Sequence, residues 1–203
     1  MRLYHHPFSS SARRAVVAAL HLDAPVELVE IGSLVDPAVR QQIVALNPNG
    51  KIPVLVDGDF VLWESNAIMQ YLADKTPGQT VYPTDPRARL EVNRWLFWCA
   101  QHWAPALGVL VFQNVIKPYI GAGEADPAEL KRGETETERF ARVLDAHLAR
   151  REWIAAPHLT IADFAIASPL IAMETAKLPL APYANIQRWF ARVQELDAWQ
   201  RAA

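Results

Sequence analysis

The sequence predicts two domains of different class, a small mixed α/β domain followed by an all-helical one. Up to about residue 80, short runs rich in β-branched residues alternate with helical patterns, which is typical of a small mixed sheet covered by helices. Beyond that point the strand patterns disappear and apolar residues recur at spacings of three and four. The proline-rich segment "TPGQTVYPTDP" lies between the halves and reads as a linker. We therefore expect residues 1–77 to form the α/β domain, 78–86 the linker and 87–203 the helical domain.

Three strand segments and two helices are expected in the first domain. The runs "RLYHH" and "VELVEI" predict two strands, and "PVLVDGDFVLW" predicts a hairpin. Its turn is assigned to Asp57-Gly58, because both central positions of a tight hairpin turn favour positive φ. Helices are expected over residues 11–22 and 65–75, where apolar residues fall on one face.

The helical half contains clear start signals. Residues 86–119 are apolar but include Pro105, so a kinked or broken helix is expected there. Asp126, followed by proline and then Glu129, predicts a helix whose cap is reinforced by the glutamate.

A second start signal lies further along, where Thr160 and Asp163 predict a capping box that stabilises the helical domain. The spacing of Trp189, Val193 and Leu196 marks the last expected helix.

Composition excludes several function classes. A net charge of -2 offers no basic surface for a nucleic-acid backbone. Cys99 is the only cysteine, which excludes an intramolecular disulfide, a CxxC redox pair and a multi-thiolate metal site. His5 and His6 are neighbours in a strand and point to opposite faces, so they do not form a simple metal site. We expect no metal and no membrane-spanning stretch, and the cytoplasm as the location.

Pro53 stands where the first strand of the hairpin should begin. Proline cannot donate to a strand ladder, so it is tolerated at the first position of a strand or at an edge. A cis bond between Ile52 and Pro53 would turn the backbone of Ile52 outward, free to pair with an extended peptide. The alternative is an ordinary trans proline that opens an edge strand.

Four segments carry a family resemblance, in order along nearly the whole chain: "HPFSSSARR", "NPNGKIPVL", "WESNAI" and "LTIADFAIASP". They resemble the successive motifs of cytosolic glutathione transferases, in particular bacterial, serine-type (theta- or phi-like) members. The resemblance implies a thioredoxin-like N-terminal domain that binds glutathione and an all-α C-terminal domain with a hydrophobic substrate pocket. It also implies a cis proline at Pro53, a homodimer, and glutathione as co-substrate without a further cofactor.

Serine-type members activate the glutathione thiol with a hydroxyl, because a free thiol with a pKa near 8.5 is only slightly ionised at neutral pH. Arg13 aligns with the arginine that follows the active serine by four positions, which places the catalytic role on Ser9. Ser10 and Tyr4 are the alternatives. Helix capping is the competing explanation for the serine run.

The resemblance also implies the rest of the glutathione site. Glu64 and Ser65 stand at a predicted helix start, where free N–H groups can receive the γ-glutamyl carboxylate and Glu64 can meet its ammonium. Lys51 is expected at the glycyl carboxylate, and Ile52 and Pro53 at the cysteinyl backbone. Related proteins have a further basic pair upstream, where this sequence offers only Arg40 beside two glutamines.

Aromatic residues suggest the second-substrate pocket. The residues expected to line it are Phe8, Trp98, Trp103 and Phe112, although most aromatics at helical spacing belong to the core. The expected function is conjugation of glutathione to a hydrophobic electrophile, typical of detoxification. Alternatives are glutathione-dependent isomerisation or dehalogenation, and a non-catalytic dimeric interaction or regulatory protein.

Overall fold

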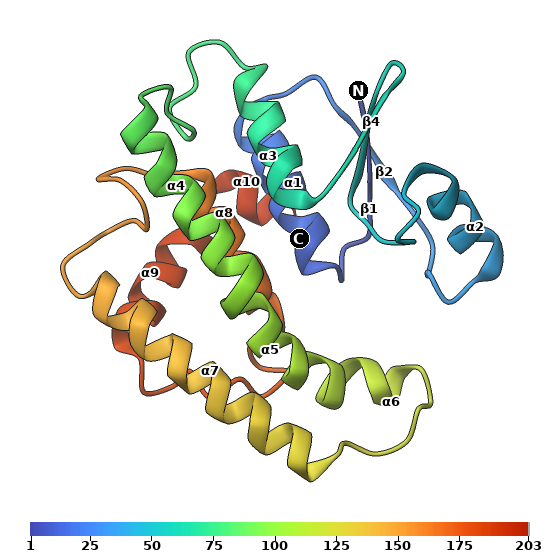
Figure 1. The fold of residues 1–203 in the computed structure, drawn as a ribbon, viewed down its shortest axis with the longest axis vertical. Coiled ribbons are helices and arrows are strands. Elements are labelled where there is room, and N and C mark those ends of the chain that lie inside the picture. The colour runs from blue at the N-terminus through green and yellow to red at the C-terminus, as the bar shows by residue number, and fades with distance from the viewer. Residues whose placement is uncertain (203) are drawn as a thin grey trace. The chain divides into compact units, whose positions relative to one another are not determined.

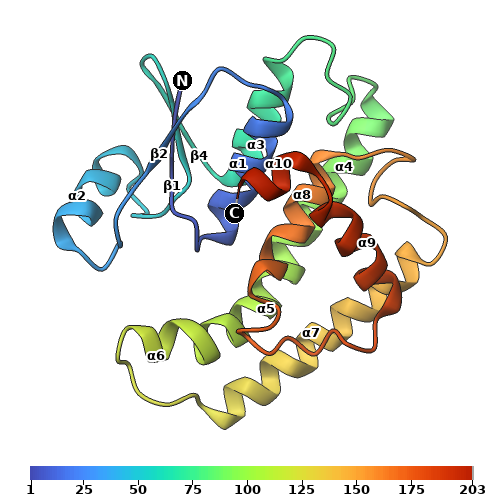
Figure 2. The ribbon, with the colours of Figure 1, turned by 180° about the vertical axis from the view of Figure 1, so that it is seen from behind.

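The computed structural model describes residues 1–202, and their contacts divide the chain into two compact units (Figures 1 and 2). The first unit contains Met1–Tyr82 together with the chain from Gln194 onward, and the second contains Pro83–Val193. The sequence predicts that the C-terminal segment belongs to the second domain. In the structure this segment packs into the first unit.

A four-stranded sheet forms the centre of the first unit (Figure 1). Its spatial order is β2-β1-β3-β4, with β1 parallel to β2, and with β3 antiparallel to both β1 and β4. The strands are β1 (Arg2–His5), β2 (Glu27–Glu30), β3 (Val54–Asp57) and β4 (Phe60–Trp63). The predicted strands and hairpin are therefore present. The turn lies one residue later than predicted, at Gly58 and Asp59, because Asp57 belongs to β3 and pairs with Phe60. Gly58 has a positive φ of +62°.

Helices cover both faces of this sheet. They are α1 (Ser10–His21), α2 (Pro37–Leu46) and α3 (Ser65–Asp74), and the short α10 (Asp197–Arg201) packs against α1. The helices α1 and α3 lie side by side on one face, and α2 lies on the other (Figures 1 and 2). Tyr4, Val54 and Val56 join Ile43 of α2 in one apolar cluster. Because side chains alternate along a strand, the fully buried Leu3 and Leu55 face the opposite side.

One long helical segment opens the second unit. It runs through α4 (Pro86–Trp98), η1 (Cys99–Trp103), α5 (Ala104–Val111), η2 (Phe112–Ile116) and α6 (Lys117–Tyr119). Both η1 and η2 are π-helical turns, and each is followed by a proline within two residues. Proline lacks the N–H that an α-helix needs, and a π turn changes which carbonyls require a partner. The expected break at Pro105 is therefore absorbed as a local change of helical pitch.

This segment bears on the expectation of no membrane-spanning stretch. By length and composition, Pro86–Tyr119 is long and apolar enough to cross a membrane, and it is the only such helix among residues 1–202. The core helix of a folded domain meets the same criterion. Here Trp103, Leu107 and Leu110 of the segment are buried in the second unit.

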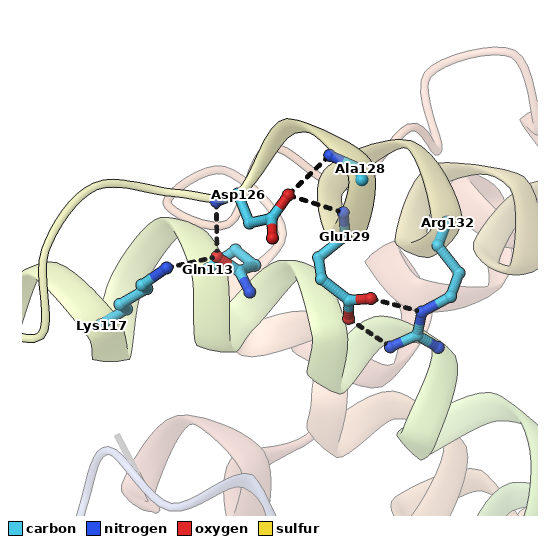
Figure 3. A network of polar contacts seen from close by, with 6 residues as sticks. All are labelled: Gln113, Lys117, Asp126, Ala128, Glu129 and Arg132. Carbon is cyan, nitrogen blue, oxygen red and sulfur yellow. Dashed lines mark hydrogen bonds and ion pairs between the residues drawn. The ribbon is translucent and has the colours of Figure 1, made fainter.

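Helix α7 (Pro127–Leu148) packs against α5, and its start is shown in Figure 3. Asp126 accepts hydrogen bonds from the backbone N–H groups of Ala128 and Glu129, at 2.8 and 3.4 Å. The carboxylate of Glu129 does not reach back to the cap as predicted, because both of its oxygens accept from Arg132. The buried Gln113 ties this start to the long segment, since its Oε1 accepts from the backbone N–H of Asp126 at 2.9 Å.

The capping box at Thr160 and Asp163 is confirmed and lies in the core of the second unit. The remaining elements are α8 (Ile161–Ala167), the 3₁₀ turn η3 (Ser168–Ala172) and α9 (Ala184–Gln194). Asp163 accepts from the backbone N–H groups of Ile154 and Thr160, from the Thr160 hydroxyl and from the indole of Trp189, at 2.9 to 3.1 Å. Burial outweighs these four hydrogen bonds and raises the pKa of Asp163 to about 6.

This pKa makes the stability of the helical unit depend on pH. A carboxyl with a raised folded-state pKa stabilises the fold below its unfolded pKa, and this contribution is lost as pH rises through the folded value. The pKa of Asp163 rises from 3.8 to about 6, so its contribution should fall by roughly 3 kcal/mol between about pH 4 and pH 6. The measurement is the free energy of unfolding of wild type minus that of Asp163→Asn across this range. A difference that stays flat would contradict the prediction.

Candidate active site

Ser9 is the residue immediately before α1. Its backbone is extended, with φ of -89° and ψ of 108°, and its Oγ accepts a hydrogen bond from the backbone N–H of Ala12 at 3.2 Å. The helix therefore uses Ser9 as an acceptor only, so its O–H remains able to donate. The first turn of α1 carries no acidic residue, so no side chain of that turn offsets the positive end of the helix.

The loop before Ser9 is ordered by His6. The carbonyl of His6 accepts from the backbone N–H of Ser9 at 2.9 Å, and its Nδ1 accepts from the N–H of Phe8 at 3.3 Å. The ring of Phe8 lies 5.5 Å from the His6 ring and is 88 % exposed. Phe8 is thus a large apolar side chain held at the surface one residue before Ser9.

The two alternatives to Ser9 occupy different environments. Ser10 is the first residue of α1, and no hydrogen bond of its hydroxyl holds the helix. Tyr4 is 6 % exposed and belongs to the apolar cluster between the sheet and α2. The buried Tyr4 therefore has less access to a ligand than the half-buried Ser9, which stands at a helix start.

The Ile52-Pro53 peptide bond is cis, as predicted from the sequence. Strand β3 begins at Val54, so Ile52 and Pro53 precede the residues that pair with β1 and β4. The preceding turn is fixed by Asn47, whose side-chain amide donates to the carbonyl of Lys51 at 2.7 Å.

Two cations border this turn. Lys51 is exposed. A guanidinium nitrogen of Arg40, on α2, lies 3.7 Å from the position that a Cβ atom on Gly50 would occupy. Gly50 has φ of +61°, a conformation that favours glycine, and the absence of a side chain lets Arg40 approach the turn. The chain thus places an arginine from α2 next to the residue that precedes Lys51.

Glu64 has an unusual backbone at the start of α3. Its φ is 74° and its ψ is 107°, which costs a non-glycine residue about 1–3 kcal/mol. Its side chain is exposed and does not cap the helix, although its carbonyl accepts from the N–H of Ile68 at 3.0 Å. Ser65 then begins α3, whose first turn contains no acidic side chain. The strained conformation therefore leaves a helix start without a side-chain cap.

The aromatic residues expected in the second-substrate pocket differ in exposure. Trp103 is fully buried, and its indole donates to the carbonyl of Ile166 at 3.0 Å, which makes it a core residue of the helical unit. Trp98 is half-buried and stacks on Trp103, with ring centroids 5.9 Å apart. Phe112 is 42 % exposed. The contact of Trp103 with a substrate stays a prediction. Because the side chain of Trp103 is fully buried, we expect it to affect the pocket only through its packing against Trp98.

Arg14, to which the sequence motifs assign no role, lies on the buried face of α1 and donates to the side chain of Asn66 at the start of α3. Its signal in the sequence was a charged residue within an otherwise apolar helix face. Within residues 1–202, no group of three or more His, Cys, Asp or Glu side chains is arranged to hold a metal ion.

Comparison with known proteins identifies the family. Residues 3–80 match the family model "Glutathione S-transferase, N-terminal domain", and residues 127–192 match "Glutathione S-transferase, C-terminal domain". The chain is 34 % identical to glutathione S-transferase 3 of Zea mays, over 99 % of this chain and 92 % of that protein. It is 29 % identical to glutathione S-transferase GstB of Escherichia coli K12, over 94 % of this chain and 91 % of that one.

Solved structures agree with this result. A glutathione S-transferase III in apo form superposes with a TM-score of 0.84 at 31 % identity, covering 99 % of this chain and 94 % of that one. A glutathione S-transferase I bound with lactoylglutathione superposes with a TM-score of 0.86 at 26 % identity, covering 100 % of this chain and 97 % of that one. The predicted fold, a mixed-sheet domain followed by a helical domain, is confirmed. The chain belongs to the glutathione S-transferase family.

Proposed function

We propose that this protein is a glutathione transferase in which the hydroxyl of Ser9 stabilises the thiolate of glutathione for attack on a hydrophobic electrophile. The family matches support the reaction class. The observation that carries the assignment to Ser9 is its single hydrogen bond with α1, in which Oγ is an acceptor. The hydroxyl proton can therefore be donated to sulfur without loss of the helix cap.

The energies required are within reach of this arrangement. Lowering a thiol pKa by two units requires about 2.7 kcal/mol of differential interaction. One hydrogen bond to a charged group supplies about 1.5–3 kcal/mol, and the unneutralised start of α1 adds a favourable field. No metal or further cofactor is needed for this step.

We assign the backbone and the two carboxylates of glutathione to residues near the start of β3 and the start of α3. The backbone of Ile52, next to Pro53, pairs with the cysteinyl unit in strand fashion. Ser65 and the first N–H groups of α3 receive the γ-glutamyl carboxylate, and the exposed Glu64 meets the ammonium. Lys51 meets the glycyl carboxylate, with Arg40 as the upstream cation, an assignment supported by its approach to Gly50.

For the second substrate we propose a flat or aromatic electrophile in contact with Phe8, Trp98 and Phe112. Their exposed or half-buried rings support this role, because an aromatic face binds an apolar ring with little loss of side-chain entropy. Thiol-assisted isomerisation and dehalogenation use the same thiolate. They are distinguished by whether the product retains glutathione.

We also propose a cytoplasmic homodimer. Leu90 and Phe97, seven residues apart on α4, are 66 % and 68 % exposed. Residues at this spacing lie on one face of a helix, and large apolar side chains on a common exposed face are typical of an interface. The buried Cys99, free of disulfide bonding, suits a reducing compartment.

The Ser9 assignment predicts that Ser9→Ala raises the pKa of bound glutathione and lowers the rate of conjugation by up to about 100-fold, because one hydrogen bond to sulfur is lost. Glutathione affinity should change little, and stability should fall by about 1 kcal/mol with the cap. Titration of thiolate absorbance measures the pKa. Ser10→Ala, Ser11→Ala and Tyr4→Phe are the controls, and a shift in one of these with none in Ser9→Ala would contradict the assignment.

The glycyl assignment predicts that wild type prefers glutathione to its glycyl ethyl ester, which lacks the terminal negative charge. Lys51→Met and Arg40→Met should each reduce this preference by roughly tenfold, since a charged hydrogen bond is worth 1.5–3 kcal/mol. The effect should appear in KM more than in kcat. If a variant keeps the full preference for glutathione over its ethyl ester, the residue replaced in that variant does not bind the glycyl carboxylate.

The dimer proposal predicts that Leu90→Glu combined with Phe97→Glu shifts the protein toward monomer, because each buried carboxylate would be unpaired in the interface. Sedimentation velocity across a range of concentrations measures the change. Val143→Glu, at an exposed apolar position on α7, is the control for added charge. A wild type that sediments as a monomer at every concentration would refute the proposal.

A further inference from the structure

The residues His6–Ser9 form a tight turn in which the side chain of the first residue holds the third. The backbone N–H of Ser9 donates to the carbonyl of His6 at 2.9 Å, and Pro7 occupies the second position, where its fixed φ favours a turn. The Nδ1 atom of His6 accepts from the backbone N–H of Phe8 at 3.3 Å. Asparagine and aspartate usually accept from the N–H two residues further on. In this turn an imidazole takes their place.

The hydrogen bond to Phe8 fixes the position of the proton on the His6 ring. A ring nitrogen that accepts a hydrogen bond carries no proton, so the proton of the neutral imidazole lies on Nε2. Within residues 1–202 this N–H has no hydrogen-bond partner, and unlike the Nε of Arg14 it is not enclosed by the protein. The half-buried ring of His6 thus uses one nitrogen in the turn and leaves an N–H open to a ligand.

This open N–H lies beside an apolar surface. The ring centroids of His6 and Phe8 are 5.5 Å apart, with the ring planes inclined at 49°, and Phe8 is 88 % exposed. The two rings form one surface that is apolar at Phe8 and offers a hydrogen-bond donor at His6. Both residues belong to the turn that ends at Ser9. A ligand that fits this surface has an apolar group and, next to it, a hydrogen-bond acceptor.

We propose that the Nε2–H of His6 donates a hydrogen bond to a carbonyl oxygen of the electrophile, and that the second substrate is an apolar α,β-unsaturated carbonyl compound. This inference rests on the proposed function, in which Ser9 stabilises the thiolate and Phe8 contacts the electrophile. It names the class of electrophile and gives a role to an N–H that the proposed function leaves unused. Displacement of a halide from a saturated carbon places no charge on an oxygen and has no use for this donor.

The donor acts where negative charge develops during the reaction. When the thiolate sulfur forms a bond to the β-carbon, the electron pair of the C=C bond moves toward the carbonyl oxygen, and an enolate results. A hydrogen bond from Nε2–H stabilises that oxygen more strongly as its charge grows. The α-carbon then takes a proton from water, which replaces the proton that the thiol released. The product is the thioether, and His6 keeps its own proton throughout.

The test compares two electrophiles that share a phenyl ring. The compound trans-4-phenyl-3-buten-2-one is an enone, whereas benzyl chloride reacts by loss of chloride and has no carbonyl group. The readout is kcat/KM for the enone divided by kcat/KM for benzyl chloride. His6→Asn places an amide oxygen near the position of Nδ1, so it can hold the turn, but it does not extend to the position of Nε2. It should lower the ratio by about tenfold or more.

His6→Gln is the complementary variant. Its amide extends toward the position of Nε2 and can donate, but it lacks the acceptor that holds Phe8. Both rates should fall together, so the ratio should stay closer to the wild-type value than it does in His6→Asn. His5→Asn is the matched control, because it removes the neighbouring imidazole from the last residue of β1, outside the turn. It should leave the ratio unchanged.

The outcomes separate this inference from the proposed function. A His6→Asn variant that keeps the wild-type ratio overturns the inference and leaves the proposed function intact, and so does a wild type that conjugates benzyl chloride but not the enone. A wild type that conjugates neither electrophile also overturns the inference. If it shows no thiolate absorbance of bound glutathione either, the proposed function is refuted with it.

A measurement on wild type covers the case in which the variants at His6 do not fold. The ketone 4-phenyl-2-butanone keeps the carbonyl but has no double bond, so it binds without reacting. In the presence of glutathione it should shift the ¹⁵Nε2 resonance of His6, assigned through the backbone of that residue. Butylbenzene, which has the ring and no acceptor, should not. Equal shifts with both compounds, or none with either, would overturn the inference.

Discussion

The first N–H groups of a helix have no partner within the helix, and this constraint organises the site. The chain brings two such starts into its first unit, those of α1 and α3, and neither first turn contains an acidic residue. Ser9 satisfies one N–H of α1 with an oxygen and retains its own proton. At α3 the cap position is held by Glu64 in a strained conformation that keeps its carboxylate away from the helix. A ligand with several negative charges can thus be bound by a protein whose net charge is itself negative.

The sheet was predictable where local chemistry alone determines it. The hairpin was predicted from Asp57-Gly58, and the apolar runs on either side become β3 and β4, although the turn itself is made by Gly58 and Asp59. Helix α2 was missed because it buries only Ile43, so its sequence lacks a strong apolar period. Helix α10 was missed because five residues are too few for a period to be read. At Asp126 the cap was predicted correctly, but the carboxylate of Glu129 accepts from Arg132, three residues further along α7, and not from the cap.

The sequence predicts which residue types the candidate site contains. It predicts the burial and the hydrogen-bond partners of those residues less well. Sequence places aromatic residues along the long helical segment but does not distinguish Trp103, fully buried and bonded to Ile166, from the exposed Phe112. Arg13 and Arg14 are adjacent in the sequence, and no local pattern distinguishes their surroundings. Only tertiary contacts show that one is bound by the C-terminal helix and that the other lies buried against α3. Such differences depend on segments distant in sequence, which no local pattern encodes.

The return of the C-terminal segment to the first unit has a consequence for biosynthesis. Arg13 donates hydrogen bonds to the carbonyls of Trp199 and Ala202, which are synthesised after residues 1–82 and after the whole of the second unit. The first unit is encoded almost wholly by the first 82 residues, yet its packing around α1 is complete only after residues 194–202 have been synthesised. The second unit, Pro83–Val193, can therefore complete its folding before the first unit has received α10. A chain truncated by a few residues would lose a contact of the helix that begins at Ser9, at a distance of some 190 positions in the sequence.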